Sequence, residues 1–378
     1  MMALTLLVAL IATLLILIIA SADQTKTNVS PAPIISDDCR IACETAEKYE
    51  REGVMRHLSC AALRPLSQSE RPVSPKLVKI SCCRGFWKPF TAYYQTQQVF
   101  LAELLNDPQL RFSGVVMFQV SDNSTILAET GRALFNLGIP YLSHAHTISP
   151  IGINCSGHVV GKTCIYQPDF HFIGHKGWER LIRSFENDSL PFRNRKNVVY
   201  WRGSSTGLAR TCEDLLRLRM CKVAEGTPWL DVKITNYIQI CHGKPYIPGN
   251  RTKEVDWPLH RGIIDVDGNV NAWGLFWRLA SGSVIFKTTS HFTNYYISQL
   301  RPWVHFVPLA DDLSDLVTRT ALVMDDNAVS MLEEIASYAR NITKRITYSS
   351  EIIRVRSELN EFYDRRMETY FLKYVQLS

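Results

Sequence analysis

The sequence has few of the features that mark specialised protein classes. Glycine and proline number 19 and 17 among 378 residues, and charged residues make up only 21%. Values this near the globular average exclude collagen-like, disordered and coiled-coil proteins. A basic stripe with interleaved aromatic residues is missing, which excludes the usual nucleic-acid binder. The length suits two domains, and the small net charge of +6 suits an anionic small-molecule ligand.

A long apolar run occurs only once, in the uncharged residues 1–22. It is long enough to span a bilayer and exceeds the about 7–15 apolar residues of a signal peptide. Ala20-Ser21-Ala22 resembles a signal-cleavage site. A signal-anchor and a cleaved signal peptide both fit, and the length favours the anchor. The polar residues 23–38 have the composition of a stem.

The ten cysteines include no CxxC pair, so disulfides are a better interpretation than zinc ligands. An oxidising compartment also agrees with six Asn-x-Ser/Thr sequons, at Asn28, Asn123, Asn154, Asn187, Asn250 and Asn341. We expect disulfides in an N-terminal segment that contains Cys39, Cys43, Cys60, Cys82 and Cys83. The spacings of Cys155/Cys164 and Cys212/Cys221 suit two local loops.

Helical patterns and buried-strand patterns alternate along the chain. In the first half, helical periodicity at 39–60, 95–106 and 125–137 alternates with apolar runs at 115–120 and 138–142. The second half has strand patterns at 198–201, 263–266, 282–287 and 303–308, and helical patterns after 215 and at 272–281, 312–324, 327–343 and 350–375. This alternation predicts an α/β fold of two Rossmann-like halves with a helical tail. Ligands of such sheets bind at the carboxyl ends of strands, here after Val120, Trp201 and Val266.

The turn Gly203–Gly207 matches the G-x-S-x-G pattern of serine hydrolases. A hydrolase triad would combine Ser205 with Asp265 and His305. The same small residues also suit a phosphate at a helix N-terminus. The flanking cations Arg202 and Arg210 favour the phosphate site, and a plain turn stays open.

Asp265-Val266-Asp267 is a D-x-D string of the kind that holds a divalent cation in some sugar transferases. The calcium-loop pattern fails, because Val270 and Phe276 occupy the glycine and glutamate positions. We therefore favour a turn-ordering role for Asp265 over a metal site. His171 and His175 lack the intervening Glu of a zinc protease.

Asp122 follows a buried strand, which places it at the carboxyl edge of the predicted sheet. An aspartate facing a cleft there is a suitable general base, because it takes a hydroxyl proton as the oxygen attacks. Capping of the next helix is the alternative.

Three segments together resemble glycosyltransferase family 90: WRGSSTGLAR (201–210), HRGIIDVDGNVNAWGLFWRLASGSVIFK (260–287) and LRPWVHFVPLADDLSDL (300–316). PDF (168–170) is a weaker match, and the resemblance covers about residues 85–350. It implies a GT-B fold, with two Rossmann-like domains facing a cleft, and an inverting, metal-independent mechanism. The expected organisation is an acceptor-side domain at 39–190, a donor-binding domain at 191–349 and a C-terminal helix at 350–378.

The resemblance also assigns roles to residues. Val120-Ser121-Asp122 matches the context of the catalytic base, and Ser204 and Arg210 match contacts to the donor diphosphate. The donor-wrapping segment falls on Asn269, Val270, Asn271, Ala272, Trp273 and Gly274. A family aromatic beside the donor falls near His171. Arg202 flanks the diphosphate turn.

One position departs from the family pattern, because characterised members have an arginine where this chain has Gly274. Arg278, one helical turn later, is the nearest substitute. We expect UDP-glucose or UDP-xylose as the donor and a protein or glycan as the acceptor. We expect no cofactor. The sequon at Asn123 adjoins the expected base, so we expect it to be unmodified. A type II membrane protein of the endoplasmic reticulum or Golgi is expected, with its catalytic domain in the lumen, or a secreted protein if residues 1–22 are cleaved.

Overall fold

The computed structural model describes residues 37–55, 57–64, 80–83, 91–122, 126–147, 164–187, 190–239, 241 and 248–375. The expected membrane segment 1–22, the stem as far as residue 36, and Asn123 lie outside them. Within the described ranges, no helix has the length and apolar character needed to cross a membrane.

The first sheet is mixed and has five strands in the order β2-β1-β3-β4-β6. They are β1 (Leu58–Leu63), β2 (Ser81–Cys82), β3 (Gly114–Gln119), β4 (Tyr141–Ser143) and β6 (Cys164–Tyr166). β3, β4 and β6 are parallel, whereas β1 runs antiparallel to β2 and β3. The expected strands at 115–120 and 138–142 are confirmed as β3 and β4. The helical prediction for 39–60 is wrong at its end, where LSCAAL pairs with β3 and buries five of its six residues.

Five helices of the described residues accompany this sheet: α2 (Asp37–Glu47), α3 (Glu52–Met55), α4 (Thr91–Asn106), α5 (Ala128–Asn136) and α6 (Phe170–Gly174). The next helix, α7 (Glu179–Asn187), packs against elements of the second half. α4 and α5 confirm the helical patterns at 95–106 and 125–137. α6 begins at Phe170, after its N-cap Asp169, whose side chain accepts a hydrogen bond from the amide of Phe172 at 2.8 Å. Such N-caps satisfy a donor that the helix leaves unpaired.

Disulfides fasten the N-terminal segment, as expected. Cys39 pairs with Cys60 and Cys43 pairs with Cys83, which joins α2 to the edge of the first sheet. The expected pairing of Cys212 with Cys221 is wrong, because Cys212 bonds to Cys241. Cys221 is a free thiol within α8 (Leu216–Ala224), where burial raises its pKa to about 12.

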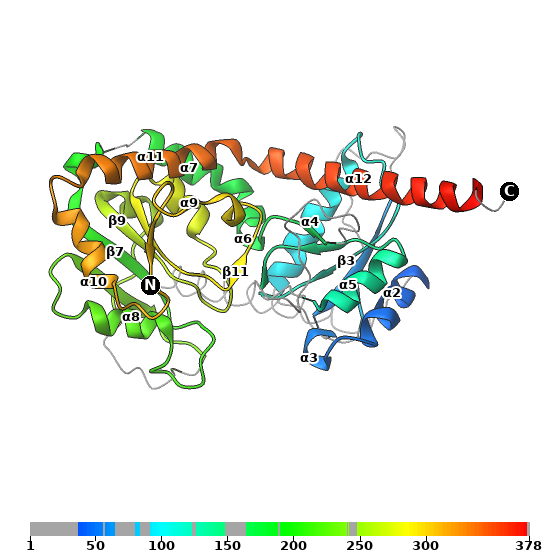
Figure 1. Ribbon diagram of the computed structural model, residues 1–378, viewed down its shortest axis with the longest axis horizontal. Coiled ribbons are helices and arrows are strands. Elements are labelled where there is room, and N and C mark those ends of the chain that lie inside the picture. Colours follow the sequence, from blue (N-terminus) through cyan, green and yellow to red (C-terminus); the bar gives the residue numbers. More distant parts are fainter. Residues whose placement is uncertain are drawn as a thin grey trace, which may run out of the picture. The chain divides into compact units, whose positions relative to one another are not determined.

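The second sheet is parallel throughout, in the order β12-β10-β9-β7-β8. Its strands are β7 (Lys196–Ser204), β8 (Leu230–Asn236), β9 (His260–Asp265), β10 (Val284–Thr288) and β12 (Val307–Leu309). All but β8 overlap an expected strand. Helix α8 (Leu216–Ala224) packs on one face with Val199 and Ile264, and α9 (Leu275–Ala280) packs on the other with Ile263 and Ile285 (Figure 1).

Helices close the chain with α10 (Leu316–Thr320), α11 (Val329–Arg345) and α12 (Tyr348–Val375), as the helical patterns predict. α12 returns to the first half, where it contacts α4 and β6 (Figure 1). A short antiparallel ladder also joins β5 (His146–Thr147) to β11 (Phe292–Thr293). The strands of the two main sheets lie on either side of residue 190/191; the division into two domains there stays a prediction.

Candidate active site

The strand order of the second sheet marks where a ligand would bind. β7 and β9 are neighbours in the sheet, and the chain goes from β7 to β8 on one side and from β9 to β10 on the other, so the connections after β7 and β9 leave in opposite directions. The crevice at such a switch point, beyond the carboxyl ends of the strands, is the usual ligand site of an open parallel sheet. β7 ends at Ser204 and β9 ends at Asp265. The expected site loops therefore adjoin.

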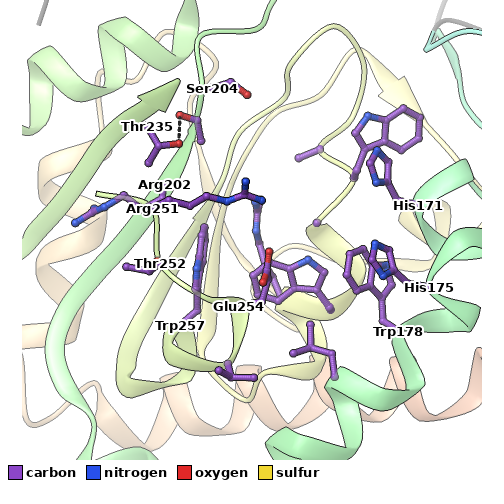
Figure 2. Close-up of a pocket in the computed structure, with 18 of the residues that line it drawn as sticks. His171, His175, Trp178, Arg202, Ser204, Thr235, Arg251, Thr252, Glu254 and Trp257 are labelled. Carbon is purple, nitrogen blue, oxygen red and sulfur yellow. Dashed lines mark hydrogen bonds between the residues drawn. The ribbon is translucent and has the colours of Figure 1, made fainter. Parts of the chain in front are cut away.

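A cavity of about 1110 Å³ opens at this point. Its volume lies slightly above the ~300–1,000 Å³ typical of small-molecule sites. In Figure 2, Ser204, Thr235 and Arg202 of the sheet lie across the cavity from His171, His175 and Trp178. Among the described residues, its lining includes one carboxylate, Glu254, and five arginines: Arg180, Arg202, Arg217, Arg251 and Arg278. This surplus of cations suits a polyanionic ligand.

Arg278 reaches the cavity from α9 and is held by a buried ionic cluster. Its Nη1 donates to Asp265 Oδ1 at 2.8 Å, and Lys287 Nζ lies 3.2 Å from Asp265 Oδ2. Burial lowers the pKa of Arg278, although Asp265 favours its charge. The pKa of Lys287 is raised, because Asp265 and Asp267 outweigh the effect of burial. Both oxygens of Asp265 therefore face cations, which disfavours the divalent-cation interpretation of the D-x-D string.

Gly274 lies directly against the Arg278 guanidinium. A Cβ built on Gly274 would lie 3.0 Å from Arg278 Nη2 and 3.0 Å from Trp277 Nε1. A side chain at 274 would therefore require the Arg278 guanidinium or the Trp277 ring to shift by a few tenths of an ångström. The Arg278 guanidinium therefore lies in the cavity beside position 274, where the family pattern has an arginine.

Arg217, which the sequence analysis did not single out, connects the two site loops. It donates to the carbonyls of Ser204 and Val266 at 3.1 Å, and also to Thr206 Oγ1 and the carbonyl of Asp267. Burial lowers the pKa of Arg217 to about 10, so the guanidinium stays charged at neutral pH. The available signal was a cation between Leu216 and Leu218, at the start of the helix that follows the small-residue turn.

Asp122 lies beyond β3 in the first half, and residues from three other segments hold it. Tyr93 Oη of α4 donates to Asp122 Oδ1 at 3.0 Å, and Asn269 Nδ2 donates to Oδ2 at 3.2 Å. His144 Nε2 lies 2.8 Å from the carbonyl oxygen of Asp122. Burial lowers the pKa of His144 to about 4, so the neutral ring donates this bond through Nε2. The bond between Asn269 and Asp122 joins the loop after β9 to the loop after β3.

Aromatic rings surround this carboxylate. Trp273 lies 5.3 Å from His171 and 5.4 Å from His144, between ring centroids. Phe170 stacks on Tyr93 at 4.6 Å. His171 and Trp273 also line the arginine-rich cavity, so they connect it with the surroundings of Asp122.

The structure brings most of the expected donor-site residues to this place. Ser204, Arg202, His171, Ala272, Trp273, Gly274 and Arg278 line the cavity. Arg202 is already paired, since its Nη2 contacts both carboxylate oxygens of Asp231 at 2.8 and 2.9 Å. Val270 and Asn271 are buried, and Arg210 is exposed outside the cavity lining. Their roles stay predictions.

The hydrolase alternative fails on geometry. Ser205 is fully buried, and its hydroxyl donates to the carbonyl of Ile238 at 2.9 Å and accepts from the amide of Ile238. β7 ends at Ser204, and Ser205, which follows it, is buried rather than exposed on an elbow. Asp265 is engaged by cations, and His305 Nδ1 accepts from the amide of Arg301.

The buried N-cap Asp169 leads to a pH-dependent prediction. Burial raises its pKa to about 7, against the amide hydrogen bonds of Phe172 and His171 that lower it. A raised carboxyl pKa means that the folded state binds the proton more tightly, so this group stabilises less as pH rises from about 4 to 7. Asp169→Asn keeps the cap without the charge. We expect its melting temperature, relative to the native protein, to be higher at pH 8 than at pH 5. A difference that does not change with pH would contradict this.

Comparisons with known proteins agree with the motifs. The Glycosyl transferase family 90 sequence model matches residues 86–363. Protein O-glucosyltransferase 2 of Danio rerio is 32% identical over 158 residues, which are 40% of this chain and 27% of that protein. Protein O-glucosyltransferase 1 of Homo sapiens is 25% identical over 170 residues, 43% of this chain and 41% of that protein. Uncharacterized protein 027R of Frog virus 3 is 27% identical over 215 residues, 47% of this chain and 22% of that protein.

The matched segments thus span less than half the length of these relatives. The family match covers most of this chain and includes β3, β4 and β6 of the first sheet, the whole second sheet and the cavity between the loops after β7 and β9. The chain belongs to glycosyltransferase family 90.

Proposed function

We propose that this protein is an inverting, metal-independent glycosyltransferase with a GT-B arrangement, which transfers glucose or xylose from a UDP-sugar to a hydroxyl group. The observation that carries the proposal is the hydrogen bond between Asp122 and Asn269. It places a carboxylate of the first half beside the loop that leads into the arginine-lined cavity of the second half. A general base and an anion site therefore adjoin.

The proposed reaction is a single displacement at the anomeric carbon. Asp122 takes the proton of the acceptor hydroxyl, and the acceptor oxygen forms a bond to the anomeric carbon. The bond from that carbon to the diphosphate oxygen breaks on the opposite face, and UDP leaves with the electron pair. Attack from the opposite face inverts the configuration. Donors placed in advance where charge develops are typically worth about 2.7–4 kcal/mol each.

The diphosphate would lie at the switch point between β7 and β9. Ser204 and Arg278 line the cavity there, and the adjoining segment Asn269–Gly274 would surround the donor. Arg210 would approach from the exposed end of the same turn. Arg217 would order both loops rather than contact the donor, since its nitrogen atoms donate to their carbonyls. Arg202, which is paired with Asp231, would contribute to the positive electrostatic potential of the cavity.

The acceptor class follows from the relatives, which are named as protein O-glucosyltransferases. A protein hydroxyl is therefore the first candidate acceptor, and a glycan hydroxyl is the second. The disulfides of the N-terminal segment indicate a lumenal or extracellular protein. We propose a location in the endoplasmic reticulum or Golgi, with residues 1–22 as the membrane anchor.

A donor panel tests the proposal. We expect the purified protein to release UDP from UDP-glucose or UDP-xylose, with water or an added acceptor, and to release it equally well in EDTA. The reason is that the arginines lining the cavity would stabilise the charge of the departing diphosphate. Binding of UDP without turnover of any UDP-sugar would identify a catalytically inactive sugar-binding relative. Activity that EDTA abolishes and manganese restores would overturn the metal-independent mechanism.

A further inference from the structure

Asp122 belongs to a chain of side-chain hydrogen bonds that extends into the second half. Asn269 donates through Nδ2 to Asp122 Oδ2 at 3.2 Å, and its Oδ1 accepts from Gln239 Nε2 at 2.8 Å. Gln239 Oε1 in turn accepts from the amide of Gly207 at 3.3 Å. The chain thus runs from the turn after β7, through the loops after β8 and β9, to the carboxylate.

Two residues are well suited to hold this hydrogen-bond chain in place: Gln239 within it, and Tyr93 on the other side of Asp122. Gln239 has a φ of 59°, which is uncommon for a residue other than glycine and persists only where the surroundings determine it. On the other side of Asp122, Tyr93 is half-buried and stacked on Phe170. Burial and the charge of Asp122 raise the pKa of Tyr93, so its hydroxyl stays protonated and remains a donor.

We propose that Tyr93 and Asn269 are positioning residues for the proposed general base, each fixing one oxygen of the Asp122 carboxylate. The inference rests on the proposed function and extends it. Donors on both oxygens stabilise the ionised form, which is the form that accepts a proton. They also restrict carboxylate rotation, so the lone pairs that remain face a defined acceptor direction. The side chain of Asn269 therefore acts on the base, whatever its backbone contributes to donor binding.

Other groups near Asp122 bear on any pH dependence. His144 contacts its backbone carbonyl, and the pKa of His144 lies near 4 because of burial. The pKa of His171 is also lowered by burial, although Asp122 acts in the opposite direction. Asp169 acts electrostatically on Tyr93 from the start of α6. Tyr93→Phe and Asn269→Ala leave these three groups in place.

The test is the pH dependence of UDP release from UDP-glucose or UDP-xylose, whichever is turned over, by the full chain. We expect Tyr93→Phe and Asn269→Ala each to lower kcat by about 10-fold or more, as loss of a hydrogen bond to a charged group typically does. The pH at which activity is half lost on the acid side should rise in both variants. Asn269→Asp should raise it further, because it keeps the acceptor for Gln239 but places a second carboxylate against Asp122. UDP affinity should stay unchanged in all three.

Two controls make the outcome decisive. Tyr338→Phe and Asn327→Ala remove the same groups from exposed positions on α11 and before it, and should leave kcat and the pH profile unchanged. Equal loss of kcat at every pH would show a merely structural role and overturn the proposal. Weaker UDP binding by Asn269→Ala with unchanged kcat would make its side chain a donor contact instead. Asp122→Asn, measured in parallel, separates the two levels: an active Asp122→Asn refutes the base itself, whereas an inactive one beside a fully active Tyr93→Phe refutes only the positioning role.

Discussion

Replacement of Asp122 by asparagine should abolish sugar transfer and leave UDP binding intact. The amide keeps the size of the carboxylate and an oxygen that accepts from Tyr93 Oη, but it does not take a proton from the acceptor. General-base catalysis typically contributes about 100- to 10,000-fold, so we expect kcat to fall by that factor. The measurement pairs UDP release from the donor that the native protein uses with calorimetric titration of UDP.

The matched control is Asp364→Asn on α12, where the carboxylate forms an exposed ion pair with Arg111. Exposed pairs contribute little, typically about 0.2–1 kcal/mol, so activity and stability should both stay near those of the native protein. Thermal unfolding of the Asp122→Asn variant without ligand checks that its fold is retained. Substantial turnover in a correctly folded Asp122→Asn variant would show that another group is the base.

The local sequence patterns were sufficient for most of the second sheet. Buried parallel strands are continuous apolar runs, and 263–266 and 282–287 have no competing pattern. The sequence patterns did not predict β8, because LDVKITN alternates buried and more exposed positions at the edge of the sheet and has no long apolar run. β1 was not predicted for a different reason. LSCAAL follows two helices and contains residues that also suit a helix, and only its pairing with β3 makes it a strand.

The candidate site also contains some residues that the sequence predicts and others that only the tertiary structure brings there. The positions of Asp122 and Ser204 were predictable, because each lies at the carboxyl end of a recognisable strand and parallel strands present these ends at one edge. The bond from Asn269 to Asp122 joins residues 147 positions apart, and nothing local specifies it. Arg217 resembled a solvated helical cation until its four acceptors, all in the site loops, were brought together by packing of α8 on the sheet. The pairing of Cys212 with Cys241 likewise depends on tertiary structure.

Arg278→Lys should weaken UDP binding while keeping the fold. In the native protein, the Arg278 guanidinium donates to Asp265 through Nη1 and lies beside Gly274 in the cavity. Lysine keeps a positive charge near the buried Asp265, which avoids the large cost of leaving a charge unpaired. It has no planar fork to contact a carboxylate and a diphosphate together. A hydrogen bond to a charged group contributes about 1.5–3 kcal/mol, so we expect the dissociation constant of UDP to rise about 10- to 150-fold.

Two further variants make this result specific. Arg219→Lys changes an exposed arginine of α8 that donates to the carbonyl of Asp312, and should leave UDP binding unchanged. Arg210→Ala removes the exposed guanidinium that the family resemblance assigns to the diphosphate, and should weaken UDP binding without lowering the melting temperature. If Arg210→Ala weakens binding and Arg278→Lys does not, the diphosphate is held at the exposed end of the turn, and Arg278 serves only the ionic cluster with Asp265 and Lys287. If Arg278→Lys alone weakens UDP binding, the Arg278 guanidinium beside Gly274 contacts the diphosphate in place of the arginine that the family pattern has at position 274.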